Sequence, residues 1–478
     1  MNYKLMLRML GRTLQVEALA MLLSMVVALL YHEDPLPFLL PLLPVALLGT
    51  LLAGIPSQTA FFSQEGFLSV GLIWMILCLF GALPFWFSGC FSSFTDCLFE
   101  IVSGFTTTGA TILSDIEVLP RGILFWRSLS SWFGGMGVLL FTLAFLPKVG
   151  ERTQILVHAE VPGPIASKLV PQTVHSSRIL YFMYFALTGA EIFAFLLAGM
   201  PLYDAVVTTF ACVCTGGFSV QNLSLAGYGL PACEVIAIVF MLLGSLNFLI
   251  FFQLCTGRSK QILRSDELRF FLWIAAGSSL LIFLNILPHY DTLGHALRDA
   301  VFQVTSILST SGFSTTDYTY WSTFSQAMLV LLMFVGGCSG STAGSMKCGR
   351  ILLLLRCARR SLLRLSHPRS VQVVRLDGKL IEEPALRSVF SFVLCFFLLL
   401  GTGCLVVSLD GFSMTTTFTA TLGCLSNVGP GLDGVGPVSN FAALSSCSKM
   451  VLSLFMLVGR LEIFPILLLL QPSTWRRA

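Results

Sequence analysis

Charged residues are scarce in this sequence. Asp, Glu, Lys and Arg together account for 11% of the 478 residues, whereas hydrophobic residues account for 55%. Soluble domains carry roughly 25% charged residues, so this composition excludes an ordinary soluble protein. It indicates an integral membrane protein with little mass outside the bilayer.

The sequence also lacks the motifs of common metal and catalytic sites. Its 14 cysteines are scattered, with no CxxC pair and no Cys/His spacing that would hold a metal. Its six histidines fall in expected loops, and the expected topology brings together no Ser/His/Asp triad or carboxylate dyad. We therefore expect no catalytic residue, no transition-metal site and no bound cofactor, and we do not expect an enzyme. The cysteines are interpreted as small apolar residues within helices.

Two glycine-rich segments match nucleotide-binding motifs only in part. GGCSGSTAGSMK, at 336–347, lacks the glycine that a phosphate loop has directly before its lysine. GPGLDG, at 429–434, fits G-x-G-x-x-G but follows no predicted strand. We expect neither nucleotide binding by this chain nor a nucleic-acid partner.

Apolar runs of about 20 residues, the length that crosses a bilayer, recur along the chain. Lys4, Arg8 and Arg12 precede the first run, and because no small-residue cleavage site follows, we predict a retained span rather than a signal peptide. Most of the 28 basic residues fall in segments that the predicted spans place on the same side of the membrane as the N-terminus. The positive-inside rule therefore predicts that both termini are cytoplasmic. The ten predicted spans, the eighth of them interrupted, are 14–31, 36–54, 66–87, 124–146, 178–199, 233–255, 270–287, 325–355, 387–408 and 450–470.

One short motif occurs four times. In its clearest copy, DAVFQVTSILSTSGFST at 299–315, an Asp opens a helix-like apolar segment that leads to a Thr-Ser-Gly turn. In three copies the Asp lies 13 residues before the last glycine, and in the fourth Thr416 stands in its place. The glycines are separated by 108, 95 and 117 residues, so the motif marks an internal repeat. The opening acids are Asp96, Asp204 and Asp299, and the glycines are Gly109, Gly217, Gly312 and Gly429.

The motif is too short to cross a bilayer, and long apolar runs flank each copy. A re-entrant hairpin is therefore predicted, since non-helical backbone survives at membrane depth only where protein or water satisfies it. Four such hairpins around one axis would present rings of carbonyl oxygens, which can replace the water shell of a potassium ion. One Thr/Gly cluster alone would indicate an ordinary loop, but four in the same context favour a filter. The expected ion-binding residues are Thr107, Thr108, Gly109, Thr215, Gly216, Gly217, Thr310, Ser311, Gly312, Asn427, Val428 and Gly429.

Each motif copy lies between two spans, so the predicted unit is span, hairpin, span. The predicted fold is an all-α polytopic membrane protein in which four such units surround one pore in a pseudo-fourfold arrangement. The first two spans have no hairpin and are expected at the periphery. The predicted units are 1–63 for these peripheral spans, then the pore repeats 64–150, 151–260, 261–360, whose second span is broken, and 361–478.

The eighth span contains a glycine-rich interruption. Four glycines within nine residues make a poor helix, so we predict a break below the third hairpin; close helix packing through small residues is the alternative. Arg460 lies within the last span, where a charge usually faces a cavity or a partner. We expect it in the pore, with a structural salt bridge as the alternative. The predicted gate residues are Gly336, Gly337, Gly340, Ser341, Thr342, Ala343, Gly344, Ser345 and Arg460.

Three further features carry predictions. Glu100, beside the first filter, is expected to buttress that hairpin. Trp126, Arg127 and Trp132 are expected to anchor the fourth span at the membrane interface. Segment 356–386 is the longest basic connection and is expected to determine topology, with binding of anionic lipid or a partner protein as a compatible second role.

The motifs of this chain resemble those of the Trk/Ktr/HKT potassium transporters, over nearly the whole chain. With its two extra N-terminal spans, the chain resembles in particular the TrkH-type membrane subunit of bacterial Trk systems. The resemblance implies a homodimer and a cytosolic TrkA-type nucleotide-binding regulatory ring. It also implies that the four motif glycines form the filter, that Gly109 favours potassium, and that 336–345 and Arg460 form the gate. The matching segments are TTTGAT (106–111), CTGGFS (214–219), STSGFS (309–314), SNVGPG (426–431), WRSLSSWFGGMG (126–137), GGCSGSTAGSMK (336–347) and LVGRLE (457–462).

We therefore expect potassium uptake across the cytoplasmic (inner) membrane, with K+ as the transported ion and membrane lipids as neighbours. The ion would pass the carbonyl filter and then the gate. Two alternatives stay open: obligatory K+/H+ or K+/Na+ symport, and a membrane receptor or scaffold that does not transport.

Overall fold

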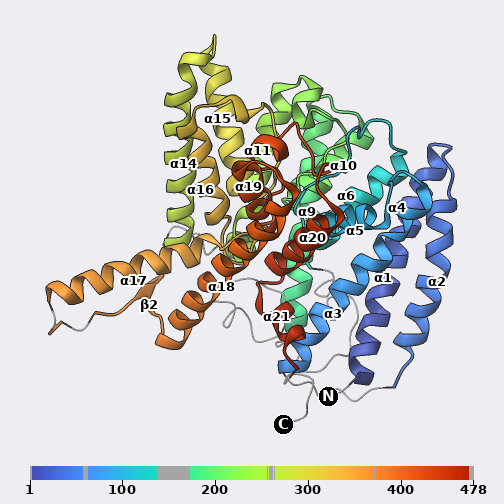
Figure 1. The fold of residues 1–478 in the computed structure, drawn as a ribbon, viewed down its shortest axis with the longest axis horizontal. Helices are drawn as coiled ribbons and strands as arrows, with labels where there is room; N and C mark the ends of the chain where they lie inside the picture. The colour runs from blue at the N-terminus through green and yellow to red at the C-terminus, as the bar shows by residue number, and fades with distance from the viewer. Residues whose placement is uncertain are drawn as a thin grey trace.

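The computed structural model describes residues 3–56, 63–137 and 173–472, apart from positions 256, 258–261, 263, 368 and 371. The described residues form helices, with one short antiparallel hairpin of β1 (Arg375–Leu376) and β2 (Lys379–Leu380). Figure 1 shows the helices gathered around the red C-terminal segments, and one arm, α17, projecting from the body.

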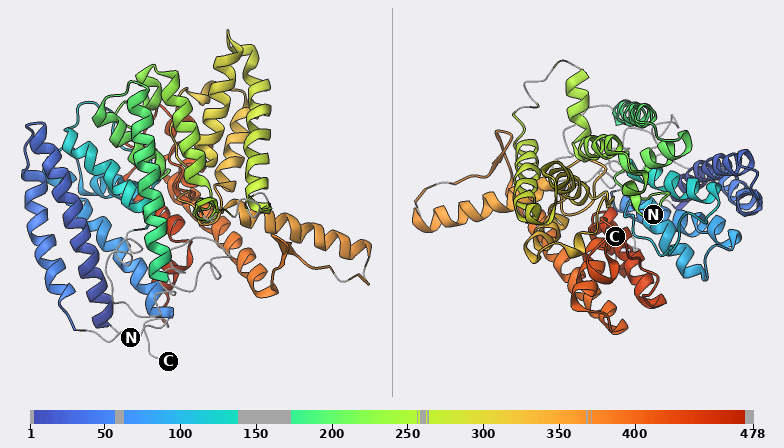
Figure 2. Two further views of the ribbon diagram at one scale, coloured as in Figure 1. Left: turned by 180° about the vertical axis from the view of Figure 1, so that it is seen from behind. Right: turned by 90° about the horizontal axis from the view of Figure 1, so that it is seen from above.

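Two long helices form a pair at the periphery (Figure 2). They are α1 (Tyr3–Leu30) and α2 (Leu36–Ala53). Gly11 of α1 lies directly against the α2 backbone at Leu52 and Ala53, so the two helices cross without a side chain between them. The helix α1 begins at Tyr3, well before the predicted residue 14, so the basic N-terminal residues are part of the same helix.

Four groups of helices follow in chain order, and each group contains one short helix that carries a motif copy. The first group is α3 (Ser63–Gly81), α4 (Leu83–Ser88), α5 (Phe94–Phe105) and α6 (Arg121–Gly135). The second is α9 (Thr173–Leu197), α10 (Leu202–Val213), α11 (Pro231–Ser245) and α12 (Phe248–Cys255). The third is α14 (Asp266–Ile286), α15 (Leu293–Leu308), α16 (Thr323–Val335) and α17 (Cys348–Ser366). The fourth is α18 (Glu383–Val407), α19 (Met414–Leu425), α20 (Ser446–Arg460) and α21 (Phe464–Leu470).

The groups succeed one another around a common centre in the right-hand view of Figure 2, from blue through green and yellow to red. Short 3-10 turns join the elements. They are η3 (Ser224–Tyr228), η4 (Leu287–His289), η5 (Tyr318–Tyr320), η6 (Ser408–Asp410) and η7 (Asp433–Val435).

The four motif helices are α5, α10, α15 and α19, and their starts are set by local sequence. Ser93, Thr292 and Ser413 cap three of them, each accepting a hydrogen bond from the backbone N–H three residues later. Pro201 precedes the fourth, α10. Each motif helix is too short to cross a bilayer, as predicted for a re-entrant segment.

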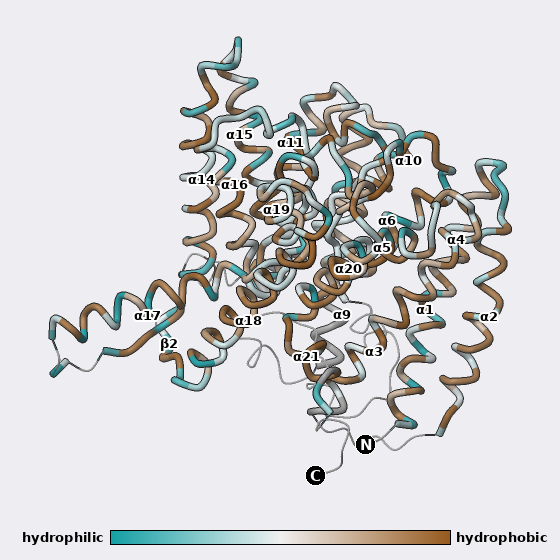
Figure 3. The backbone as a smooth tube through the Cα atoms, viewed as in Figure 1, coloured by the Kyte–Doolittle hydropathy of each residue, from teal (hydrophilic) through white to brown (hydrophobic). Residues whose placement is uncertain are grey.

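Six helices among the described residues are long and apolar enough to span a membrane. The candidate membrane spans begin at Tyr3, Leu36, Gly66, Leu180, Asp266 and Glu383. Figure 3 shows long hydrophobic stretches along these helices and hydrophilic residues concentrated on α17. The predicted span 124–146 is α6 as far as Gly135, and its part beyond 137 lies outside the described residues.

The span that follows the motif turn is broken in the second, third and fourth groups, between α11 and α12, α16 and α17, and α20 and α21. The predicted break in 325–355 is confirmed, because α16 ends at Val335 and α17 begins at Cys348. Continuous helices over 233–255 and 450–470 were wrong predictions, since α11 ends at Ser245 and α20 ends at Arg460. The break after α11 follows from contacts with segment 336–347, and the break after α20 is stabilised by a salt bridge between Glu462 and Arg350; both are described below.

Candidate functional site

The four motif turns, 107–109, 215–217, 310–312 and 427–429, share one backbone conformation. The first residue of each turn is left-handed although it is not glycine, with φ of 54°, 57°, 59° and 53° in chain order. The glycine two positions later is also left-handed, with φ of 78°, 69°, 80° and 90°. A left-handed non-glycine residue is uncommon, so its recurrence at equivalent positions shows that the fourth copy is conformationally intact despite its irregular sequence.

The four motif glycines form a closed ring of backbone contacts. A methyl group placed on Gly109 would lie 2.5 Å from the carbonyl oxygen of Gly216, in the second copy. In the same way Gly217 abuts the Ser311 carbonyl, Gly312 the Val428 carbonyl and Gly429 the Thr108 carbonyl, each closer than 3.0 Å. The structure therefore brings all four copies to one centre, and any side chain at these positions would collide with the next copy.

Carboxylates on two of the motif helices hold the segment that returns from the turn. Glu100 of α5 accepts hydrogen bonds from the Thr111 hydroxyl at 2.9 Å and the Ile112 N–H at 3.1 Å. Asp299 of α15 accepts one from Thr315 at 3.1 Å. The expected buttressing role of Glu100 is thus present.

In the fourth copy the acid is supplied by the return segment instead of the helix. Thr416 replaces the opening Asp, and its hydroxyl donates to Asp433 at 3.0 Å. The fourth copy therefore keeps a carboxylate contact between helix start and return segment.

A hollow of about 130 Å³ opens over the ring on the side of the return segments. Residues of all four copies line it, among them Gly109, Gly217, Gly312 and Pro430. Arg127 is its one charged lining residue among those the structure describes. The ring is thus accessible from this side through a small, mostly neutral vestibule.

Segment 336–347 lies against the opposite side of the motif turns. The N–H of Gly344 donates to the Thr310 hydroxyl at 2.7 Å, and the hydroxyls of Thr215 and Thr342 are 3.2 Å apart. Gly344 also lies against the Ser426 carbonyl. One segment therefore contacts the second, third and fourth motif turns.

The same segment enters the break between α11 and α12. Cys338 N–H donates to the Ser245 carbonyl at 2.9 Å, Thr342 N–H to the Gly244 carbonyl at 3.3 Å, and Phe248 N–H to the Gly340 carbonyl at 3.2 Å. These bonds replace helical ones, as irregular backbone inside a membrane protein requires. This explains why the helix over 233–255 is discontinuous.

Arg460 ends α20 and reaches both the segment and the first group. Its guanidinium donates to the Thr342 carbonyl at 2.6 Å, and to the carbonyls of Gly134 and Gly135 at 2.6 and 2.5 Å. The break after it is stabilised by Glu462, which forms a bidentate pair with Arg350 at 3.1 and 2.6 Å. The hydrophobic pattern of 450–470 contains no signal for this pairing, since Arg350 is 112 residues away.

Two further charged groups hold segment 336–347. Lys347 is buried, and its ammonium donates to the carbonyls of Ser341 and Ala343. Glu267, at the start of α14, accepts a hydrogen bond from the Ser339 N–H at 2.7 Å. Sequence reasoning missed Glu267, because the acid precedes the segment by some 70 positions and has no motif of its own.

The interfacial anchor predicted on α6 was wrong. Trp126 and Arg127 are 0% and 2% exposed. The Trp126 ring N–H donates to the Gly81 carbonyl at 3.0 Å, and Arg127 pairs with Glu100 at 2.6 Å. A buried cation with a buried acid on another helix is invisible to a linear pattern.

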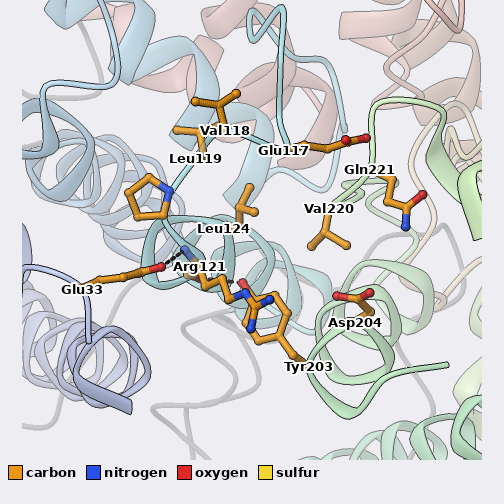
Figure 4. A pocket seen from close by; sticks show the side chains of 11 residues that line it. Glu33, Glu117, Val118, Leu119, Arg121, Leu124, Tyr203, Asp204, Val220 and Gln221 are labelled. Atoms are coloured by element: carbon orange, nitrogen blue, oxygen red, sulfur yellow. Dashed lines mark hydrogen bonds between the residues drawn. The ribbon is translucent and has the colours of Figure 1, made fainter. Parts of the chain in front are cut away.

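A separate pocket of about 520 Å³ lies where α1, α6 and α10 meet, outside the ring (Figure 4). Glu33 accepts the N–H groups of Arg121 and Gly122 at 2.7 and 2.8 Å, which caps the start of α6. Tyr203 donates to the Arg121 carbonyl at 2.6 Å. These contacts join the peripheral pair to the first two groups.

Comparison with known proteins identifies the family. The sequence profile described as "TrkH: Cation transport protein" matches residues 50–476. The chain belongs to the TrkH family. It is accordingly a membrane protein of a cation transport family and not an enzyme.

Full-length relatives of this TrkH-family chain share about a third of its residues. The Trk system potassium uptake protein TrkH of Vibrio parahaemolyticus serotype O3:K6 (strain RIMD 2210633) is 35% identical over 487 aligned positions, covering 100% of both chains. The Trk system potassium uptake protein TrkG of Escherichia coli (strain K12) is 34% identical, covering 99% of both.

A solved structure extends this likeness to the fold. The crystal structure of the potassium transporter TrkH from Vibrio parahaemolyticus matches with a TM-score of 0.89 at 34% identity, covering 100% of both chains. The predicted all-α fold with pseudo-fourfold repeats is therefore confirmed.

Proposed function

We propose that this TrkH-family chain takes up potassium through the ring formed by its four motif turns. The observation that carries the proposal is the closed sequence of contacts from Gly109 through Gly217 and Gly312 to Gly429. Backbone that alternates in handedness turns successive carbonyl groups toward a shared axis, and carbonyl rings bind dehydrated potassium. The potassium uptake named for the relatives supports the choice of ion.

The ion-binding residues of this proposal are the twelve of the motif turns, 107–109, 215–217, 310–312 and 427–429. Nine of the twelve are buried, and all except Val428 are polar or glycine. The hydroxyls of Thr108, Thr215 and Thr310 are hydrogen-bonded, whereas the buried Thr107 hydroxyl has no partner among the described residues. Asn427, for example, donates from its amide to the Thr108 hydroxyl at 3.0 Å and to the Met456 carbonyl at 2.9 Å. Such cross-links between copies would keep the ring from collapsing when an ion leaves.

The proposed gate is segment 336–345 together with Arg460. The segment contacts three of the four motif turns, and the guanidinium holds it at the Thr342 carbonyl. A cation leaving the ring on this side would meet both the segment and a positive charge. Movement of the segment would open the path, and Arg460 would hold it shut.

The proposed units keep the boundaries 1–63, 64–150, 151–260, 261–360 and 361–478. We place the chain in the cytoplasmic (inner) membrane with both termini in the cytoplasm. The proposed assembly is a homodimer that binds a cytosolic TrkA-type regulatory ring and membrane lipids. The projecting α17 supports an assembly role, because Leu355, Leu362 and Leu365 on it are 54%, 66% and 81% exposed.

The decisive experiment compares two glycines of the third copy. Gly312 abuts the Val428 carbonyl, whereas Gly294, at the start of the motif helix α15, has nothing within 4 Å. In potassium-starved cells expressing the chain, we expect Rb+ uptake to be lost in G312A and kept in G294A. Uptake that survives G312A would contradict the filter, and no uptake by the wild type would favour a receptor or scaffold.

Obligatory symport with H+ or Na+ is the second candidate mechanism. Channel-like flow predicts a reversal potential in proteoliposomes that follows the K+ gradient alone. A membrane potential of 100 mV supplies about 2.3 kcal/mol per charge, enough to drive accumulation without a coupling ion. A reversal potential that shifts with the H+ or Na+ gradient would establish coupling.

A further inference from the structure

A buried ion pair links the first two motif copies. Arg127 of α6 and Glu100 of α5 are 2.6 Å apart, with side chains 2% and 0% exposed. Breaking such a pair by removing one partner is costly, because a buried charge is left uncompensated. The pair is therefore a rigid junction and not a solvated surface contact.

Each member of the pair holds the return segment of a different copy. Glu100 binds the first copy through the Thr111 hydroxyl and the Ile112 N–H. Arg127 donates to the Ser219 carbonyl of the second copy at 3.1 Å. Its guanidinium also lies 3.5 Å from the centre of the Phe218 ring. The ion pair thus connects two backbone segments that leave adjacent positions of the ring.

The junction lies directly at the vestibule. Arg127 and Ser219 line the hollow together with Gly109 and Gly217, and Ser219 is two residues from Gly217. A shift of the Arg127–Ser219 contact would therefore change the spacing of the first two copies at the ring. Glu100 neutralises the guanidinium, so Arg127 contributes geometry here more than repulsion of cations.

We infer that Arg127, oriented by Glu100, is a positioning residue that sets ion selectivity by fixing the distance between the first and second motif copies. Arginine fits this role because its planar fork donates in several directions at once. A lysine would carry the same charge but would not bind Glu100, Ser219 and the Phe218 face together. This inference rests on the proposed potassium filter.

The test measures the K+/Na+ permeability ratio from reversal potentials in proteoliposomes of the full chain. For R127K we expect K+ flux to persist while the ratio falls about tenfold or more, the factor that corresponds to losing one charge-assisted hydrogen bond. The double variant E100Q/R127Q serves as a second probe, because a neutral pair avoids an uncompensated buried charge. A permeability ratio reports on the ring independently of how much protein folds.

The matched control removes the other buried pair of the same helix. Lys449 and Asp96 are 2.8 Å apart and each 9% exposed, and Asp96, in the first turn of α5, accepts hydrogen bonds from Lys449 and Ser92. We expect D96N/K449M to keep the wild-type ratio. An equal loss in this control would indicate general loosening of α5 and would overturn the inference, as would an unchanged ratio in both Arg127 variants. A wild type that carries no K+ would instead overturn the proposed function.

Discussion

Replacing Arg460 with alanine tests whether the guanidinium holds segment 336–347 against the motif turns. The side chain makes hydrogen bonds to three carbonyl oxygens, of which one, that of Thr342, belongs to the segment. The other two, of Gly134 and Gly135, belong to the end of α6. The substitution therefore removes one of the links between the segment and its surroundings and leaves its contacts with α11 in place.

The magnitude follows from that single link. A hydrogen bond to a charged group contributes about 1.5–3 kcal/mol net. If Arg460 binds the segment only in its blocking position, its loss shifts the equilibrium toward the open position by about tenfold to a hundredfold. R460A should therefore raise K+ flux, until the open position predominates. The K+ flux of R460K should fall between those of the wild type and R460A, because an ammonium can still reach one carbonyl.

The assay is K+ flux in proteoliposomes with and without deletion of 340–344. The deletion by itself should raise flux, since these residues include Thr342 and Gly344, which contact the motif turns. In the deletion background R460A should add nothing, because its partner on the segment is gone. Thermal unfolding in detergent measures any accompanying loss of stability.

Three results would refute this reasoning. Unchanged flux in R460A with normal stability would mean that the guanidinium does not restrain the segment. Unfolding of R460A with no folded fraction would assign the residue to structure alone, as the salt-bridge interpretation of the sequence had it. Additive effects of R460A and the deletion on K+ flux would mean that Arg460 acts independently of the segment.

Three further substitutions have defined outcomes. E267Q weakens the bond from the Ser339 N–H and should raise K+ flux by at most about tenfold, measured in the same proteoliposomes; a decrease would contradict a restraining role. K449M leaves Asp96 buried without its partner and should lower the free energy of unfolding by about 3–5 kcal/mol, with D96N/K449M less affected in thermal unfolding. The hydroxyls of Ser413 and Thr416 hold the pKa of Asp433 below its ordinary 3.8, so this carboxylate stabilises the fold above that pH and loses its contribution as the pH falls further. The stability advantage of wild type over D433N should therefore shrink below about pH 3.8 in a pH series of unfolding temperatures. An advantage that grows below this pH would contradict a lowered pKa of Asp433 in the folded protein.

Much of the architecture could be predicted from local sequence. Apolar run length determines which segments are spans, and the recurrence of Thr and Gly at equivalent positions identified four re-entrant turns. The break in the eighth span was predictable because four glycines within nine residues disfavour helix through backbone entropy. These are short-range properties, which a linear pattern records.

The other breaks were not predictable in this way. The sequence 233–255 is mostly apolar and long enough for a continuous span, yet α11 ends at Ser245 because amide groups of segment 336–347 bind its last carbonyls. The end of α20 depends likewise on Glu462 meeting Arg350. In both cases the partner lies about a hundred residues away, and tertiary hydrogen bonds outweigh local helix propensity.

By itself the sequence determined that the chain is a membrane protein of four related units and which twelve residues form its motif turns. Only the tertiary structure decided that the four turns close into a ring, that Arg127 is buried with Glu100, and that Arg460 reaches the Thr342 carbonyl. The reason is physical: periodicity and composition act along the chain, whereas ring closure and buried charge pairing depend on which distant groups share a space without water.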